Sequence, residues 1–105
     1  MSIIQDTVDG QASLRFYTGE LLVDDAVLAA GHTPNGYFWE GVVTFLDPTL
    51  AEAIELDSEA GMFAAYAEPD QLQRLRNLIS PLLTDSAAIT TVIENANEAG
   101  FEFDD

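Results

Sequence analysis

One stretch decides the class of fold: Ile54-Glu55-Leu56-Asp57-Ser58-Glu59-Ala60-Gly61-Met62-Phe63-Ala64-Ala65-Tyr66. Apolar and acidic residues alternate in its first four positions, a turn-forming segment follows, and an apolar strand resumes at Met62. Gly61 is expected to supply a positive φ in the turn. The pattern predicts a β-hairpin, and therefore an antiparallel sheet.

Two helices are predicted after the hairpin. Pro69 suits a first helical turn, and a stripe of apolar residues follows at helical spacing until Pro81, which should end or kink the helix. A last helix is capped by Thr84 or Asp85 and stopped by Gly100. The two apolar faces comprise Leu72, Leu75, Leu78, Ile79 and Leu82, and Ile89, Val92, Ile93 and Ala96.

Before the hairpin, period-2 alternation predicts a strand from Ala12 to Tyr17. A short helix, 26–30, should be capped by Asp24 and Asp25 and end at Gly31. A central helix, 37–46, with Asn35 as its cap, is apolar nearly all round, although its aromatic and β-branched content leaves a strand as the competing prediction. Asp47-Pro48 breaks that element and suits the start of another helix.

These elements predict an α+β fold, in which about four helices cover one face of a small antiparallel sheet. Residues 1–11 read as a loose acidic lead-in, and residues 12–105 as a single domain. Phe101-Glu102-Phe103 alternates like a short closing strand. No segment resembles a signal peptide or membrane span, so we expect a soluble, cytoplasmic protein.

The charge of the chain excludes several partners. The 105 residues include 3 arginines, no lysine and 19 carboxylates, which gives a formal net charge of −16. Arg15, Arg74 and Arg76 are too few to bind polyphosphate, so nucleic acid and anionic membranes are disfavoured. The acidity fits three explanations: solubility, a saline environment, or a basic protein partner.

The residues available for catalysis are few. The chain has one histidine, no cysteine and no lysine, and it lacks nucleotide-binding glycine loops and a nucleophile elbow. A small metal-dependent or His/carboxylate-dependent hydrolase, in which Asp24, Asp25, His32 and Glu40 converge, is one alternative function. A generic acidic adaptor domain is another. We expect no enzyme activity, no cofactor and no metal.

Two motifs resemble the bacterial immunity protein family fifty-one, whose members belong to polymorphic toxin systems. One motif is Gly31-His32-Thr33-Pro34-Asn35-Gly36-Tyr37-Phe38-Trp39-Glu40-Gly41, and the other is Leu56-Asp57-Ser58-Glu59-Ala60-Gly61-Met62-Phe63-Ala64-Ala65-Tyr66. The resemblance extends from about Leu14 to Ala96 and implies a non-enzymatic protein that binds and neutralises a toxin domain. Such a partner would give the acidic surface a target, since an acidic inhibitor suits a basic, nuclease-like toxin.

The candidate contact residues come from these motifs and from the aspartates that precede them. Tyr37 and Trp39 are possible anchors, although burial in the core is favoured for Trp39. The candidate charges are Asp24, Asp25, Glu40, Asp57 and Glu59. We expect the protein to be a monomer or a weak homodimer.

Overall fold

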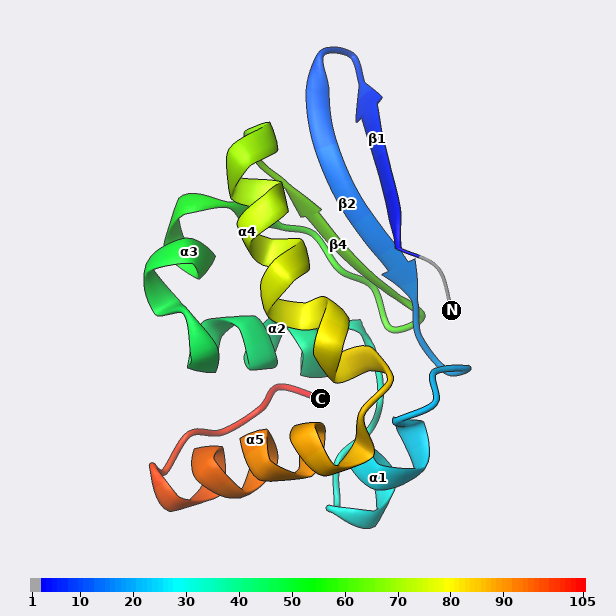
Figure 1. Cartoon of the computed structure of the whole chain (residues 1–105), viewed down its shortest axis with the longest axis vertical. Coiled ribbons are helices and arrows are strands. Elements are labelled where there is room, and N and C mark those ends of the chain that lie inside the picture. The colour runs from blue at the N-terminus through cyan, green and yellow to red at the C-terminus, as the bar shows by residue number, and fades with distance from the viewer. Residues whose placement is uncertain (1–2) are drawn as a thin grey trace.

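The computed structural model describes residues 3–105 and confirms the α+β fold. Two hairpins form one antiparallel sheet in the order β1-β2-β4-β3 (Figure 1). The strands are β1 (Ile4–Val8), β2 (Gln11–Tyr17), β3 (Glu55–Leu56) and β4 (Met62–Tyr66). The predicted hairpin is confirmed, because β3 pairs with β4, and β4 joins the sheet by pairing with β2.

The N-terminal lead-in is a correction, because Ile4–Val8 forms an edge strand paired with β2. Asp9 and Gly10 connect the two strands, and both have positive φ, of 52° and 80°. Two such residues make the tight turn that matches the twist of a hairpin, and Asp-Gly is a strong sequence signal for it. The prediction missed that signal. Met1 and Ser2 lie outside the described residues.

Five α-helices follow the predicted order: α1 (Asp24–Ala29), α2 (Gly36–Leu46), α3 (Pro48–Ala53), α4 (Pro69–Ile79) and α5 (Ser86–Glu98). Asn35, Asp47 and Asp85 cap α2, α3 and α5 through bonds to the backbone N–H three residues on, which confirms the helical prediction for the central segment. Pro81 lies in a 3₁₀ turn, Ser80–Leu83, that ends α4. Gly31 and Gly100 follow helices with positive φ, as expected.

Two local predictions are wrong. Val23 occupies the N-cap of α1, so Asp24 and Asp25 lie in the first turn instead of capping it. Gly61 does not have a positive φ, although backbone hydrogen bonds between Glu59 and Met62 close the hairpin around Ala60 and Gly61.

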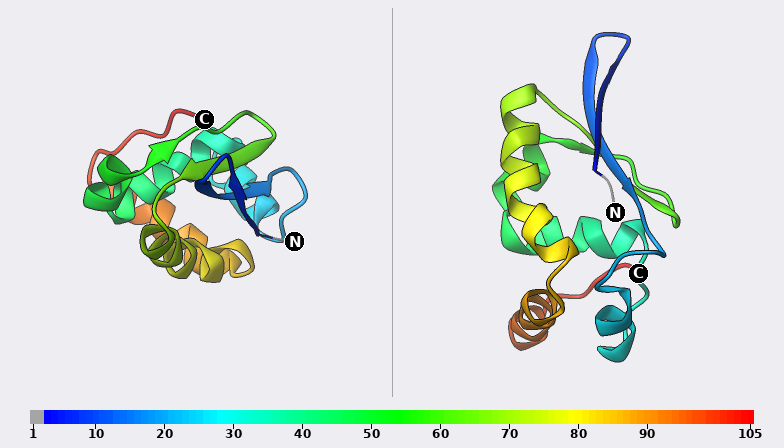
Figure 2. Two further views of the ribbon diagram at one scale, coloured as in Figure 1. Left: turned by 90° about the horizontal axis from the view of Figure 1, so that it is seen from above. Right: turned by 45° about the vertical axis from the view of Figure 1, so that its right-hand side comes forward.

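The core lies between one face of the sheet and the helices. Phe16 stacks on Phe63, with ring centroids 5.0 Å apart, and meets Trp39 of α2 edge-to-face at 5.7 Å. These three side chains are completely buried. Helices α2 and α4 lie on this side of the sheet, while α1 and α5 pack together at the end remote from the β1–β2 turn (Figures 1 and 2). We call this side the covered face.

The C-terminal segment, 101–105, is not a strand, which corrects the prediction of a closing strand. Phe103 stacks on Phe38 with ring centroids 5.0 Å apart, and Phe101 packs against Phe45 at 5.4 Å. A Cβ at Gly41 would overlap the ring of Phe103, so this glycine makes room for it. Aromatic packing against α2, and not sheet pairing, therefore explains the apolar alternation at the C-terminal end.

Candidate partner-binding site

The seven predicted contact residues do not form one site. Trp39 is completely buried in the core, so its side chain cannot serve as an exposed anchor in this structure. Asp24 is also buried, with 8% of its surface exposed. The remaining five lie in three places: Asp25 on α1, Tyr37 and Glu40 on α2, and Asp57 and Glu59 on the β3–β4 hairpin.

Tyr37 and Glu40 line a groove of about 290 Å³ between α2 and the C-terminal segment. Its other lining residues are Gly41, Thr44, Leu56, Phe101, Glu102 and Asp104. Tyr37 is 40% exposed, so it is available to a partner. The groove places Glu40 with two further carboxylates, Glu102 and Asp104, which the prediction left out of the site because no local pattern indicates that the C-terminal segment folds back.

Glu40 also has a structural role, because its Oε2 accepts a hydrogen bond from the backbone N–H of Ser58 at 3.0 Å. The Oγ of Ser58 accepts from the backbone N–H of Ala64 at 3.0 Å. At the start of α2, the backbone N–H of Gly36 donates to Ala60 at 3.2 Å, and a Cβ at Gly36 would overlap the carbonyl oxygens of Glu59 and Met62. The contacts of Gly36 and Glu40 therefore hold α2 against the β3–β4 hairpin.

Asp57 and Glu59 lie in the segment after β3, where the chain continues to pair with β4. The backbone N–H of Asp57 donates to Ala64 at 2.9 Å, and that of Glu59 donates to Met62 at 2.8 Å. Both side chains are exposed. Because side chains alternate along an extended segment, Glu55, Asp57 and Glu59 share one face, opposite to the face that carries Leu56 and Ser58. They form an acidic row on the side of the sheet away from α2.

The catalytic alternative required His32 to meet Glu40 and one of the two aspartates. His32 instead faces Asp105, with its Nδ1 3.2 Å from both carboxylate oxygens, and its ring packs against Phe103. The backbone N–H of Thr33 also donates to Asp105, at 2.6 Å. Within residues 3–105, no three His, Asp or Glu side chains are grouped to hold a metal ion. The predicted His/carboxylate centre is therefore not assembled.

Asp24 is a buried carboxyl with one oxygen in use. Its Oδ2 accepts from the backbone N–H of Leu21 at 3.3 Å, while Oδ1 has no hydrogen-bond partner among the residues described. Burial raises the pKa of Asp24, the hydrogen bond from Leu21 lowers it, and repulsion from Asp25 adds to the rise. The raised pKa means that keeping Asp24 ionised in the folded state costs free energy of folding. Because its side chain is buried, Asp24 is not a surface contact of the kind predicted.

None of the helices within residues 3–105 has the length and apolar character needed to cross a membrane. Residues 3–105 form a small α+β domain with exposed carboxylates, in which His32 is hydrogen-bonded to Asp105. The family model described as Immunity protein 51 matches residues 9–98, so the chain belongs to the Immunity protein 51 family. No curated protein and no solved structure matches the chain significantly. Membership of an immunity protein family implies a toxin as the binding partner.

Proposed function

We propose that this protein binds a cognate, basic toxin domain of a bacterial polymorphic toxin system in the cytoplasm and blocks it without any catalytic step. The observation that carries the proposal is the family match over residues 9–98. A nuclease-like toxin fits best, because an enzyme that binds polyphosphate needs a basic surface, and an acidic inhibitor can occupy that surface in place of the substrate.

The distribution of charge supports a basic partner. The net charge of −16 creates a negative field around a small domain, which accelerates encounter with a basic protein. Only one ion pair between an arginine and a carboxylate forms within residues 3–105, between Arg74 and Asp47 at 2.6 Å. Most carboxylates are therefore free to face a partner.

The proposed contact residues are the predicted ones that remain accessible. Asp25, Asp57 and Glu59 are exposed, and Tyr37 lines the groove with 40% of its surface exposed. Glu40 is half-buried and lines the groove, while its Oε2 accepts a hydrogen bond from Ser58. Trp39 and Asp24 are not proposed as contacts, because both are buried.

The test uses the C-terminal domain encoded by the reading frame beside that of this chain. Its expression alone should arrest growth, and co-expression of this protein should restore growth. The dissociation constant of the purified pair should rise by about tenfold or more as NaCl increases from about 50 mM to about 500 mM, because salt screens charge pairs. Failure to protect would overturn the immunity function, whereas affinity independent of salt would overturn the basic character of the partner.

A further inference from the structure

The sheet has a second face that no helix of residues 3–105 covers (Figure 2). The pairing register identifies its side chains, because directly paired residues point to the same side. Tyr17 pairs with Met62, Arg15 pairs with Ala64 and Ile4, and Tyr66 pairs with Ser13 and Glu55. We define the open face by six residues and call these its centre: Ile4, Arg15, Tyr17, Met62, Ala64 and Tyr66. Tyr17 is strongly exposed, Ile4, Arg15, Met62 and Tyr66 are partly buried, and Ala64 is buried, as is Ser13 on the same side.

The composition of the open face is unusual for a surface in contact with water. An antiparallel sheet that is covered on one side normally carries polar residues on the other. Here the centre holds two tyrosines, a methionine and an isoleucine, and Tyr17 is 64% exposed. Tyrosine, methionine and arginine are the residue types enriched in the centres of protein interfaces.

Carboxylates border the open face on both edges. The acidic row Glu55, Asp57 and Glu59 runs along the β3 edge, and Asp6 lies on β1, where it pairs with Ser13. All four carboxylates are exposed. An apolar centre with an acidic border is complementary to a protein surface that has an apolar centre and basic side chains around it.

Arg15 adds a polar anchor to the centre. Arg74 pairs with Asp47, and Arg76 donates to Oε1 of Gln5, but within residues 3–105 Arg15 has neither an ion pair nor a side-chain hydrogen bond. It lies between Ile4 and Ala64 and is partly buried. A guanidinium without a partner in so acidic a chain is free to donate to an oxygen on another molecule.

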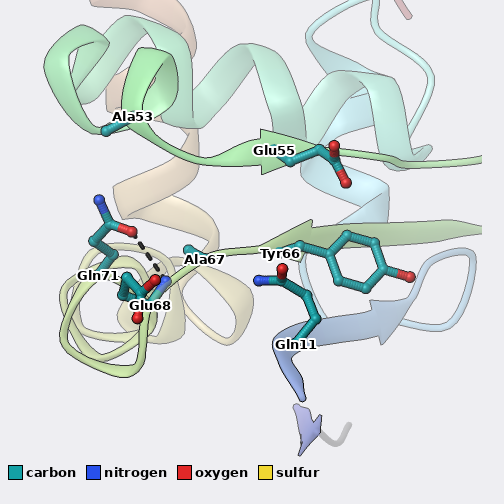
Figure 3. Close-up of a pocket in the computed structure, with 7 residues that line it drawn as sticks. All are labelled: Gln11, Ala53, Glu55, Tyr66, Ala67, Glu68 and Gln71. Carbon is teal, nitrogen blue, oxygen red and sulfur yellow. Dashed lines mark hydrogen bonds between the residues drawn. The ribbon is translucent and has the colours of Figure 1, made fainter. Parts of the chain in front are cut away.

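One end of the open face leads into a pocket of about 360 Å³, shown in Figure 3. The side chains of Gln11, Glu55 and Tyr66 come from three neighbouring strands and lie near one another. Glu68 and Gln71 of the α4 region line its other side, where the backbone N–H of Glu68 donates to Oε1 of Gln71 at 3.0 Å. Two carboxylates and two amides make this pocket suitable for a lysine or arginine side chain of the partner.

We propose that the open face is the surface that binds the toxin domain. The inference rests on the proposed function and adds the location of the interface and the chemistry of its partner. It keeps Asp57 and Glu59 as contacts, and it leaves out Asp25, Tyr37 and Glu40, which lie on α1 and α2 and not on the open face. The toxin presents an apolar patch to Tyr17, Met62 and Tyr66, an acceptor oxygen to Arg15, and basic side chains to the acidic row. A second copy of this chain is a poorer occupant, because it would bring another net charge of −16 and another acidic border to the same interface.

The test measures affinity for the toxin domain encoded beside this chain, with variants of the open face and matched controls. Tyr17→Ala and Arg15→Ala should each raise the dissociation constant by about tenfold or more. Leu46→Ala, on α2 and 37% exposed, is the control for loss of an exposed apolar side chain, and should change the constant by less than about twofold. Circular dichroism verifies that each variant is folded.

A charge-matched pair tests the border. The double variant Asp57→Asn, Glu59→Gln should weaken binding and reduce its dependence on salt. The double variant Glu94→Gln, Glu98→Gln removes the same charge from exposed positions of α5. Its affinity for the toxin domain and the salt dependence of that affinity should stay close to those of the wild type.

The outcomes separate the two proposals. If the wild-type protein neither binds nor protects, the proposed function fails. If the wild type protects and Tyr17→Ala and Arg15→Ala bind as tightly as it does, only the open-face interface fails. Light scattering of the free protein should show a monomer, and a dimer that Tyr17→Ala dissociates would assign the open face to a second copy instead.

Discussion

The two faces of the sheet carry adjacent residues with opposite roles. Phe16 is completely buried on the covered face, while its neighbour Tyr17 is 64% exposed on the open face. In β4 the same alternation puts Phe63 in the core and Met62 on the open side. Both faces are rich in apolar groups, so hydrophobicity alone does not distinguish the residues that hold the fold from those offered to a partner.

The faces differ in the chemistry of their side chains. The aromatic residues of the covered face are Phe16 and Phe63, and Trp39 of α2 packs against Phe16 with an indole N–H that has no partner among the described residues. The open face uses Tyr17, Tyr66 and Arg15, each of which combines an apolar body with a polar end. Such side chains tolerate water in the free protein and contribute both area and hydrogen bonds when a partner covers them.

The largest expected effect compares neighbouring residues of β2. Phe16→Ala removes a fully buried ring and should lower the free energy of unfolding by about 3–5 kcal/mol, whereas Tyr17→Ala should lower it by less than about 1 kcal/mol. Urea denaturation followed by circular dichroism measures both. Equal losses would show that Tyr17 supports the fold as much as Phe16 does and would remove the contrast between the faces.

A smaller effect is expected where α2 touches the hairpin. Gly36→Ala would push a methyl group into the carbonyl oxygens of Glu59 and Met62, which should cost about 1–3 kcal/mol of unfolding free energy. Gly61→Ala is the control in the same hairpin, since no atom lies near its added Cβ and its φ is not positive; it should cost less than about 0.5 kcal/mol. Similar denaturation midpoints for the two variants would contradict a tight contact at Gly36.

The smallest effect concerns Asp24, which belongs to neither face. Its pKa in the folded state is raised above the ordinary 3.8, so the folded protein binds this proton more tightly than the unfolded chain does. The resulting cost to stability is absent below the ordinary pKa and grows as pH rises through the folded-state pKa. Asp24→Asn keeps an oxygen for Leu21 without the charge and should stabilise the protein at neutral pH by less than about 1 kcal/mol.

Denaturation from about pH 3 to about pH 7 measures that difference. The free energy of unfolding of Asp24→Asn should exceed that of the wild type only towards the upper end of this pH range, where Asp24 of the wild type is ionised. Asp25→Asn provides the exposed comparison and should have a smaller effect. An Asp24→Asn advantage that is constant over the whole range would contradict a charge-based cost.

Local signals predicted much of the fold. Asn35 and Asp47 cap their helices, Pro69 begins α4, and the 54–66 stretch forms the hairpin, because each depends on hydrogen bonds or φ values within a few residues. Asp9-Gly10 carried an equally local signal, and its omission caused the error at β1.

The candidate site was predicted less well, because exposure depends on distant packing. Trp39 and Tyr37 belong to the same motif, yet α2 turns one into the core and the other towards the groove. Phe103 alternates as a strand residue would, but stacks on Phe38, 65 positions earlier in the chain, and leaves the strand prediction wrong. No pattern near either residue records these contacts.

The sequence by itself determined most of the element types and their ends, the alternation within β2 and the net charge of −16, since all of these follow from residue identity and short-range geometry. Only the tertiary structure decided which side of the sheet the helices cover. It placed Asp57 and Glu59 on the open face, and Tyr37 and Glu40 in the groove. The physical reason is that burial is a property of contacts between elements, and a strand with apolar residues on both sides does not specify which side α2 and α4 will pack against.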